Sequence, residues 1–499
     1  MNLRPYQSEV IAAARREIAS GRRRPLIVAP TGAGKTIIAA KIADGAVAKG
    51  RRVLFLAHRR ELIAQAADKL WTSGRIESAI LMAGYPSRPQ CPVQVASVQT
   101  LWARAHRSEA ISRPEADVVI VDEAHRARSR TYQEILDSYP HAVILGLTAT
   151  PCRSDGRGLG NVFDALVQCP PVADLTAQGY LVPTVVYAPS EPDLAGVRIA
   201  RGDYVERELA ARSDTPVLVG DIVEHWLRLA EGRKTVVFGA SVAHSVHIRD
   251  AFRAAGIAAE HIDGRTPADE RDAILRAQSR GDVTVVCNCM VLAEGWDQPD
   301  VSCCVIARAT KNMGLYRQMA GRVLRPWPGK TDALILDHAG VTREHGFVDE
   351  PVEWTLDVDS RAVSAVADRR QREPSERLRA CPQCTAIRTA GEACRVCGWA
   401  PSVRGQAVEV VDGDLVRHER GQKAQKREWS MAEKQAMYSE LLSYCRDKGY
   451  RPGWAANKYR EKFGVWPRGL SDEPIPPSPA TLAWIRSRQI AWAKRNAAA

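Results

Sequence analysis

The stretch Ala29-Pro30-Thr31-Gly32-Ala33-Gly34-Lys35-Thr36 decides the fold. It follows an aliphatic run at 26–29 and opens a helical pattern near Ile37, which predicts a strand, a tight turn and a helix. Its glycines allow the backbone N–H groups and the helix N-terminus to surround phosphate oxygens. Lys35 adds a positive charge, and the Thr36 hydroxyl can bind Mg²⁺. The residues expected to contact the bound phosphate and metal are Thr31, Gly32, Ala33, Gly34, Lys35 and Thr36. A chance glycine-rich turn is the alternative reading.

Short aliphatic runs alternate with helical patterns from residue 26 to about 337. The runs are 26–29, 53–56, 118–121, 143–145, 236–238, 283–286, 304–306 and 334–336. Apolar runs without strict alternation predict strands covered on both faces, as in parallel α/β sheets. A proline-rich lapse at about 170–215 predicts the boundary between two α/β domains.

Two acids, Asp122 and Glu123, follow the run at 118–121, and His125 comes two residues later. The carboxyl end of a buried strand is where an α/β sheet places its ligand crevice. Asp122 is therefore expected to hold Mg²⁺, and Glu123 to orient and deprotonate an attacking water. Alone, such a pair would more often cap a helix; the phosphate-binding loop upstream favours the catalytic reading.

These motifs resemble those of superfamily 2 helicases and translocases in the DEAH-box form, and the resemblance covers about residues 3–337. It implies two tandem RecA-like parallel-sheet domains of the P-loop NTPase class, with ATP and Mg²⁺. The further matching segments are Leu3–Gln7, Phe55–Leu62, Ser97–Leu101, Leu147–Pro151, Leu292–Asp297 and Tyr316–Pro326.

The resemblance also implies roles for single residues. For the nucleotide it implies contacts from Arg4, Gln7, Gly295 and Asp297, with Gln7 suited to bidentate bonding with adenine. For the nucleic-acid backbone it implies contacts from His58, Arg59 and Thr100. For coupling of hydrolysis to domain movement it implies His125, Thr148 and Thr150.

Gln318, Arg322 and Arg325 are spaced so that one helical face would carry all three. An arginine aimed across an interdomain cleft at the γ-phosphate can stabilise the transition state, which in phosphoryl transfer gives roughly 10³ to 10⁵ in rate. The sequence therefore predicts a catalytic role for this segment. The alternative is a surface helix with solvated arginines.

Cys381, Cys384, Cys394 and Cys397 form two CxxC pairs nine residues apart. Four thiolates at this spacing match a tetrahedral, structural Zn²⁺ site. Two disulfides, an iron–sulfur cluster and a redox-active CxxC are the alternatives.

The last third of the chain is basic and rich in tryptophan. Residues 351–499 hold 26 Lys and Arg against 18 Asp and Glu, a net charge of +8 out of +12, and seven of the twelve tryptophans. Cations mixed with rings suit a polyanion with stackable bases. The segment 448–467 resembles RadD-like bacterial and phage DNA-repair helicases, which implies single-strand-binding protein as a partner. A small module with core tryptophans is the alternative.

The predicted domains are an ATP-binding domain (1–168), a second motor domain (169–350, with a connection over 169–215), a charged linker (351–378), a Cys₄ element (379–400) and a basic aromatic module (401–499). The predicted function is an ATP-dependent DNA helicase or translocase that acts on single-stranded or junction-containing DNA in repair or recombination. The alternatives are an RNA helicase, an ATP-gated scaffold and, less favoured, a restriction-type nuclease motor. We expect a cytoplasmic protein that does not bind membranes, because the chain shows neither a signal segment nor a run of about 20 apolar residues.

Overall fold

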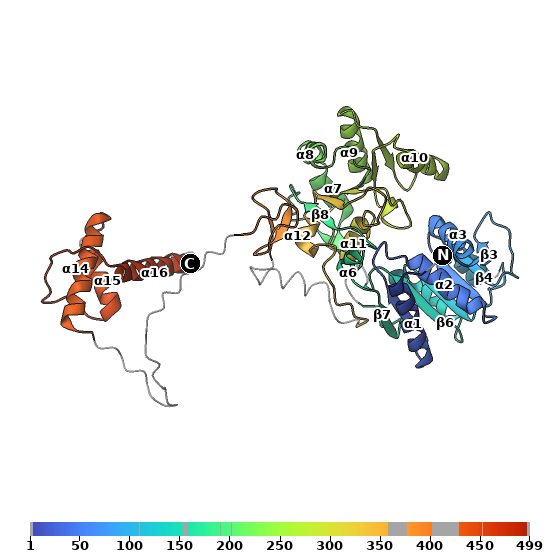
Figure 1. Ribbon diagram of the computed structural model, residues 1–499, viewed down its shortest axis with the longest axis horizontal. Helices are drawn as coiled ribbons and strands as arrows, with labels where there is room; N and C mark the ends of the chain where they lie inside the picture. Colours follow the sequence, from blue (N-terminus) through green and yellow to red (C-terminus); the bar gives the residue numbers. More distant parts are fainter. Residues whose placement is uncertain are drawn as a thin grey trace. The chain divides into compact units, whose positions relative to one another are not determined.

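The computed structural model describes residues 3–108, 110–152, 158–189, 191–200, 202–357, 377–401, 429–451 and 453–496. The chain divides into two compact units, residues 1–404 and 405–499. The first unit contains two lobes, each built on a parallel sheet (Figure 1).

The first lobe is a seven-stranded parallel sheet in the order β3-β4-β2-β5-β6-β1-β7. Its strands are β1 (Pro25–Val28), β2 (Val53–Ala57), β3 (Ser78–Leu81), β4 (Val93–Ser97), β5 (Val118–Asp122), β6 (Val143–Thr148) and β7 (Ala165–Gln168). One face is covered by α1 (Pro5–Ala19), α2 (Lys35–Val47) and α3 (Arg60–Gly74). The other face is covered by α4 (Val98–Leu101), a π-helix (Trp102–Arg107) and α5 (Arg130–Asp137).

The second lobe is a six-stranded parallel sheet in the order β12-β13-β11-β14-β15-β8. Its strands are β8 (Thr184–Tyr187), β11 (Thr235–Gly239), β12 (Ala259–Ile262), β13 (Val285–Asn288), β14 (Cys303–Ala307) and β15 (Ala333–Asp337). Helices α8 (Pro216–Leu229) and α9 (Val242–Ala254) pack on one face. Helices α10 (Ala268–Arg280), α11 (Met313–Gly321) and α12 (Val341–His345) pack on the other. The predicted pair of RecA-like parallel-sheet domains is confirmed.

The segment expected to connect the domains, 169–215, has structure of its own. It contains α6 (Val172–Ala177), the short hairpin β9–β10 (Ile199–Ala200 and Asp203–Tyr204) and α7 (Glu206–Ser213). It also contains β8, which pairs with β15 in parallel at the edge of the second sheet. The chain therefore enters the second lobe by residue 184.

The two lobes share apolar contacts and a segment that returns from the second lobe to the first. One buried cluster joins Ala33 of the first lobe, Leu181 of the connection and Leu324 of the second lobe. The return segment, residues 347–357, packs Trp354 against the core of the first lobe. Its backbone continues the contact, because the Gly160 N–H donates to Leu356 O at 2.7 Å. The lobes thus meet along both the connection and the return segment.

The cysteine pairs lie at a small hairpin of β16 (Leu378–Ala380) and β17 (Ile387–Thr389). This hairpin packs against Tyr187 of β8 and belongs to the first unit. The second unit consists, in its described part, of α14 (Met431–Asp447), α15 (Gly453–Phe463) and α16 (Pro479–Asn496). Most of the predicted linker (358–376) lies outside the described residues. So does the segment 409–416, whose apolar residues around Gly413 are typical of a small hairpin. Among the described helices, none has the length and apolar character to cross a membrane.

Candidate nucleotide site at the lobe interface

The predicted phosphate-binding loop joins β1 to α2. Gly32 and Gly34 have φ angles of 90° and 83°, a region that L side chains rarely adopt. A Cβ on Gly34 would lie 2.6 Å from Gln7 Nε2, so any other residue here would have to displace the Gln7 amide. Lys35 begins α2, and its largely buried Nζ lies 3.5 Å from Glu123 Oε1. The loop therefore presents one cation beside the predicted catalytic acid.

Side chains at the start of α1 form hydrogen bonds to this loop. Tyr6 donates through its hydroxyl to Ala33 O at 2.7 Å, and Gln7 Nε2 donates to the same carbonyl at 3.1 Å. Gln7 Oε1 accepts from the Arg4 N–H at 3.0 Å, so both ends of the buried amide are engaged. The guanidinium of Arg4 lies over the ring of Tyr180, 4.8 Å from its centroid. Reading of adenine by Gln7 stays a prediction and would require the amide to exchange partners.

Asp122 and Glu123 lie at the carboxyl end of β5, as the sequence predicts. Both are buried, and the Glu123 N–H donates to Asp122 Oδ1 at 3.0 Å. Burial and the neighbouring Glu123 charge raise the pKa of Asp122 above its usual range. Burial alone would also raise the pKa of Glu123, but Lys35 and His125 outweigh it and lower this pKa below its usual range. A divalent cation would stabilise two ionised carboxylates buried this close together. The pair therefore fits a Mg²⁺ ion held by Asp122 and Thr36.

Glu123 carries two features typical of a reacting group. Its φ of 48° places a non-glycine residue in the left-handed region, a strain that concentrates at functional sites. Its buried Oε2 accepts no hydrogen bond from the described residues, although His125 Nδ1 lies 3.4 Å away. This oxygen therefore has lone pairs left to accept a hydrogen bond from a water molecule.

The three predicted coupling residues lie together. His125 Nδ1 is 3.4 Å from Thr148 Oγ1, and the Thr148 hydroxyl donates to Thr150 O at 2.9 Å. Thr150 also faces the second lobe, because a Cβ on Gly314 of α11 would lie 2.9 Å from Thr150 Oγ1. Movement of α11 would thus change the contacts of Thr150 in this cluster.

The expectation that one helical face carries Gln318, Arg322 and Arg325 is wrong. Helix α11 ends at Gly321, so Arg322 lies at its C-cap and Arg325 lies beyond it. A side chain on Gly321 would overlap Thr31 of the phosphate-binding loop, and Pro326 disfavours helical geometry at the residue before it. The helix therefore ends where the first lobe approaches.

Both arginines nevertheless lie at the lobe interface and contact the predicted 292–297 motif. Arg322 is buried, and its guanidinium donates to Ala293 O at 2.6 Å and to Trp296 O at 2.6 Å. Burial and neighbouring Arg325 lower the pKa of Arg322 to about 10, while the charge of Glu123 acts in the opposite direction. Arg325 forms an ion pair with Asp297, and its side chain packs beside Gly32. The loop that carries Lys35 and the arginine segment therefore face each other.

Of the predicted nucleic-acid contacts, His58 and Arg59 point into the lobe interface. His58 Nε2 lies 3.0 Å from Glu294 Oε2, and Arg59 donates to Val291 O at 2.8 Å. Thr100 lies elsewhere, with its N–H bonded to Ser97 Oγ at 3.4 Å at the start of α4. Gly295, predicted for the nucleotide, accepts from Gln65 Nε2 at 2.6 Å through its carbonyl. The structure thus groups three of these four residues around the 291–297 loop.

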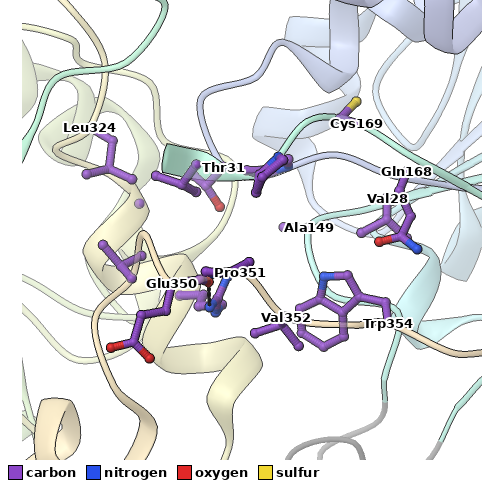
Figure 2. A pocket seen from close by; sticks show the side chains of 16 residues that line it. Val28, Thr31, Ala149, Gln168, Cys169, Leu324, Glu350, Pro351, Val352 and Trp354 are labelled. Atoms are coloured by element: carbon purple, nitrogen blue, oxygen red, sulfur yellow. Dashed lines mark hydrogen bonds between the residues drawn. The ribbon is translucent and has the colours of Figure 1, made fainter. Parts of the chain in front are cut away.

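Two cavities open between the lobes. The larger has a volume of about 650 Å³ and is lined from both lobes, among others by Gln99, Arg128, Thr150, Asn312 and Gln318. The smaller, of about 150 Å³, lies beside the phosphate-binding loop at Thr31. Figure 2 shows the indole of Trp354 and the side chain of Val352 from the return segment at its edge, opposite Thr31 and Leu324.

The four predicted metal ligands converge. The Sγ atoms of Cys381, Cys384, Cys394 and Cys397 all lie within 4.8 Å of one another. Two of the Sγ separations are 3.6 and 3.5 Å, close to the roughly 3.8 Å edge of a tetrahedron with 2.3 Å Zn–S bonds. The residues therefore fit a Zn²⁺ ion. The Gly398 N–H donates to Cys394 O at 2.9 Å and closes the second turn.

Each of the two lobes matches a known protein family. A family model described as type III restriction enzyme, res subunit, matches residues 1–153, and one described as helicase conserved C-terminal domain matches residues 219–326. The matches fall on the two lobes in order. The chain belongs to the superfamily 2 helicases. This helicase is an ATP-hydrolysing enzyme, and its family implies ATP and Mg²⁺.

Relatives of this helicase include a phage protein and yeast proteins. It is 29% identical over 374 residues to a 51.5 kDa protein of a Lactococcus phage, a match that covers 75% of this chain and 77% of that protein. It is 33% identical over 374 residues to the putative mitochondrial ATP-dependent helicase irc3 of Schizosaccharomyces pombe. That match covers 72% of this chain and 61% of the yeast protein, so the helicase spans less than two thirds of it.

Among solved structures, the helicase is similar to the ATP-dependent type ISP restriction-modification enzyme LlaBIII bound to DNA. The TM-score is 0.52 with 17% identity, over 70% of this chain and 29% of that one. At this identity the likeness shows the shared fold. The predicted likeness to RadD-like helicases stays a prediction.

Sequence reasoning missed Glu294, Tyr180 and the return segment as parts of this site. Glu294 lies inside a recognised motif. An acid between apolar residues and a glycine could have indicated a functional carboxylate. Tyr180 and Trp354 carry no such signal, because a single aromatic side chain in a connection is equally consistent with core packing.

Proposed function

We propose that this helicase couples ATP hydrolysis to movement along, or remodelling of, DNA in repair or recombination. The observation that carries the proposal is the opposition of two segments across one interface: Lys35 and its loop on the first lobe, and Arg322 with Arg325 on the second. Catalysis then requires the lobes to close, and phosphate release favours opening. A strand bound to both lobes would be displaced by each cycle.

In this proposal each group has a distinct role. Lys35 binds the phosphates, and Asp122 with Thr36 holds Mg²⁺, which supplies charge neutralisation on the phosphate oxygens. Glu123 accepts the proton of the attacking water through Oε2, the oxygen that lies 3.4 Å from His125 Nδ1. Arg322 has donors left after its bonds to two carbonyls, because a guanidinium carries five N–H groups. Those donors, or Arg325, stabilise the transition-state charge.

DNA rather than RNA is proposed as the polymer. The basic, tryptophan-rich C-terminal sequence supports a nucleic acid of either kind, and the likeness to a restriction enzyme solved with DNA favours DNA. An RNA helicase and an ATP-gated scaffold that does not translocate are the competing functions. Single-strand-binding protein as a partner, a cytoplasmic location and the domain boundaries predicted from the sequence stay parts of the proposal.

The ATPase rate with different polymers tests the proposal. We expect single-stranded or forked DNA to stimulate hydrolysis more than RNA does, with a stimulation that weakens steeply as salt rises, because phosphate contacts release counterions. Equal or greater stimulation by RNA would favour an RNA helicase. Slow hydrolysis without displacement of a bound protein or strand would favour the scaffold.

Metal analysis tests the Cys₄ site. We expect about one zinc per chain, because a complete thiolate set at this geometry binds Zn²⁺ in a closed structural site. Cys381→Ser should lose the metal, whereas Cys445→Ser, at a buried thiol outside the cluster, should retain it. A coloured preparation that contains iron would contradict the assignment.

A further inference from the structure

Glu294 is a buried carboxylate that the second lobe inserts into the first. Its oxygens lie 3.0 Å from His58 Nε2, 3.1 Å from an Arg126 Nη atom and 3.5 Å from Arg59 Nε. His125 Nε2 lies 3.7 Å away. All four side chains belong to the first lobe. An ionised carboxylate so deeply buried is stable only when it is paired, so these contacts depend on the lobes being together.

The electrostatic balance keeps this group charged. Burial acts to raise the pKa of Glu294, but the hydrogen bond with His58 and the charge of Arg126 outweigh it and hold this pKa well below its usual range. Arg126 is half-exposed, so part of the network borders the solvent of the large interlobe cavity.

The backbone around Glu294 is fixed from both lobes as well. Gln65 and Arg59 of the first lobe donate to carbonyls at 295 and 291, and Arg322 of the second lobe donates to carbonyls at 293 and 296. The 291–297 loop is therefore held between α3 and the arginine segment. A change in lobe separation would have to move Glu294.

His125 connects Glu294 to the catalytic acid. One ring nitrogen faces Glu294, and the other lies 3.4 Å from Glu123 Oε2 and 3.4 Å from Thr148 Oγ1. Glu123 in turn lies 3.5 Å from Lys35 Nζ. A continuous line of charged and polar groups thus runs from the phosphate-binding loop to the second lobe.

We propose that Glu294 is a positioning residue: when the lobes close, it fixes the ring of His125 and thereby the orientation of Glu123 toward the attacking water. The inference rests on the proposed function, because it assumes hydrolysis at the closed interface. A competing role exists for the same geometry. Glu294 could simply occupy the place of a backbone phosphate on His58 and Arg59, in which case its removal would strengthen nucleic-acid binding without slowing hydrolysis.

The test is the steady-state ATPase of the full chain with single-stranded oligodeoxythymidine. Glu294→Gln keeps the shape and removes the charge, and we expect the stimulated kcat to fall roughly 10²-fold, the cost of a misplaced catalytic group. The KM for ATP and the Kd of a fluorescent ATP analogue should stay within about twofold, because Glu294 is not proposed to touch the nucleotide. Glu294→Asp should recover part of the loss. The matched control is Glu344→Gln, which removes a carboxylate paired with Lys311 inside the second lobe and should leave kcat unchanged.

A second variant keeps the inference testable if Glu294→Gln does not fold. Arg126→Gln changes a half-exposed side chain and should also lower kcat at constant nucleotide affinity. The double variant should be no slower than the slower single variant, because both act through one pair.

Two results would overturn the inference. One is a Glu294→Gln enzyme with normal stimulated kcat, above all if it binds the oligonucleotide more tightly. The other is a loss of kcat and nucleotide affinity together with a lower unfolding temperature, which indicates a structural role. Failure of the proposed function is distinguishable, because then the wild-type chain itself would show no stimulated hydrolysis.

Discussion

Lys35→Ala is expected to abolish detectable ATP turnover, a loss of about 10³-fold or more, since a single preorganised group at a site of developing charge already contributes 10²–10³. The variant removes the cation that the loop aims at the phosphates. It also leaves the buried Glu123 carboxylate without the charge 3.5 Å away that stabilises it. Phosphate release at saturating ATP and oligonucleotide measures the effect.

Lys41→Ala provides the matched control. Lys41 lies two turns further along α2, half-exposed and paired with Asp44, and is not part of the proposed site. We expect its turnover to equal that of the wild type. Stimulated turnover retained by Lys35→Ala would remove the assignment of the phosphate-binding loop.

Arg322→Ala or Arg325→Ala is expected to slow hydrolysis by roughly 10³ to 10⁵ while nucleotide binding stays largely intact. Arg322 is the stronger candidate for the transition-state arginine, because it is buried at the interface and interacts electrostatically with the Glu123 carboxylate. Comparison of kcat with the Kd of a fluorescent ATP analogue separates the two effects.

The buried position of Arg322 complicates its truncation. Alanine would leave the carbonyls of Ala293 and Trp296 without this donor, a cost of about 1–3 kcal/mol each if they stay buried. Thermal unfolding of Arg322→Ala and Arg322→Lys should therefore accompany the kinetics. Arg343→Ala, an exposed arginine paired with Glu191, is the control. Normal turnover in both the Arg322 and Arg325 variants would show that the transition-state arginine lies elsewhere.

The central strands of both sheets could be predicted from sequence because they are buried on both faces. Most residues of β2, β5, β11 and β14 are apolar, so these strands could be predicted without knowing which strands pair with them. The missed strands β3, β7, β8 and β12 lie at sheet edges, and β12 contains Glu260 and His261. Their pairing depends on partners far away in the chain, which local periodicity does not encode. Strand β4 was missed as well, although it is buried between β3 and β2, because Gln94 and Ser97 interrupt its apolar run.

The site was predictable to the level of motifs but not of contacts. The spacing of 29–36 and 122–125 fixed which residues meet, because strand ends of a parallel sheet converge at one edge. The close approach of Thr31 from the other lobe to Gly321, and the hydrogen bond from Gln7 to the loop that it supports, join segments far apart in the chain. Such contacts across the fold leave no pattern in the local sequence.

A structure of the helicase with Mg²⁺ and a non-hydrolysable ATP analogue tests the central claim most directly. We expect the γ-phosphate to lie within hydrogen-bonding distance of Lys35 Nζ and of a guanidinium nitrogen from Arg322 or Arg325. A triphosphate held by the first lobe, with both arginines still bound only to the 293–297 loop, would contradict it.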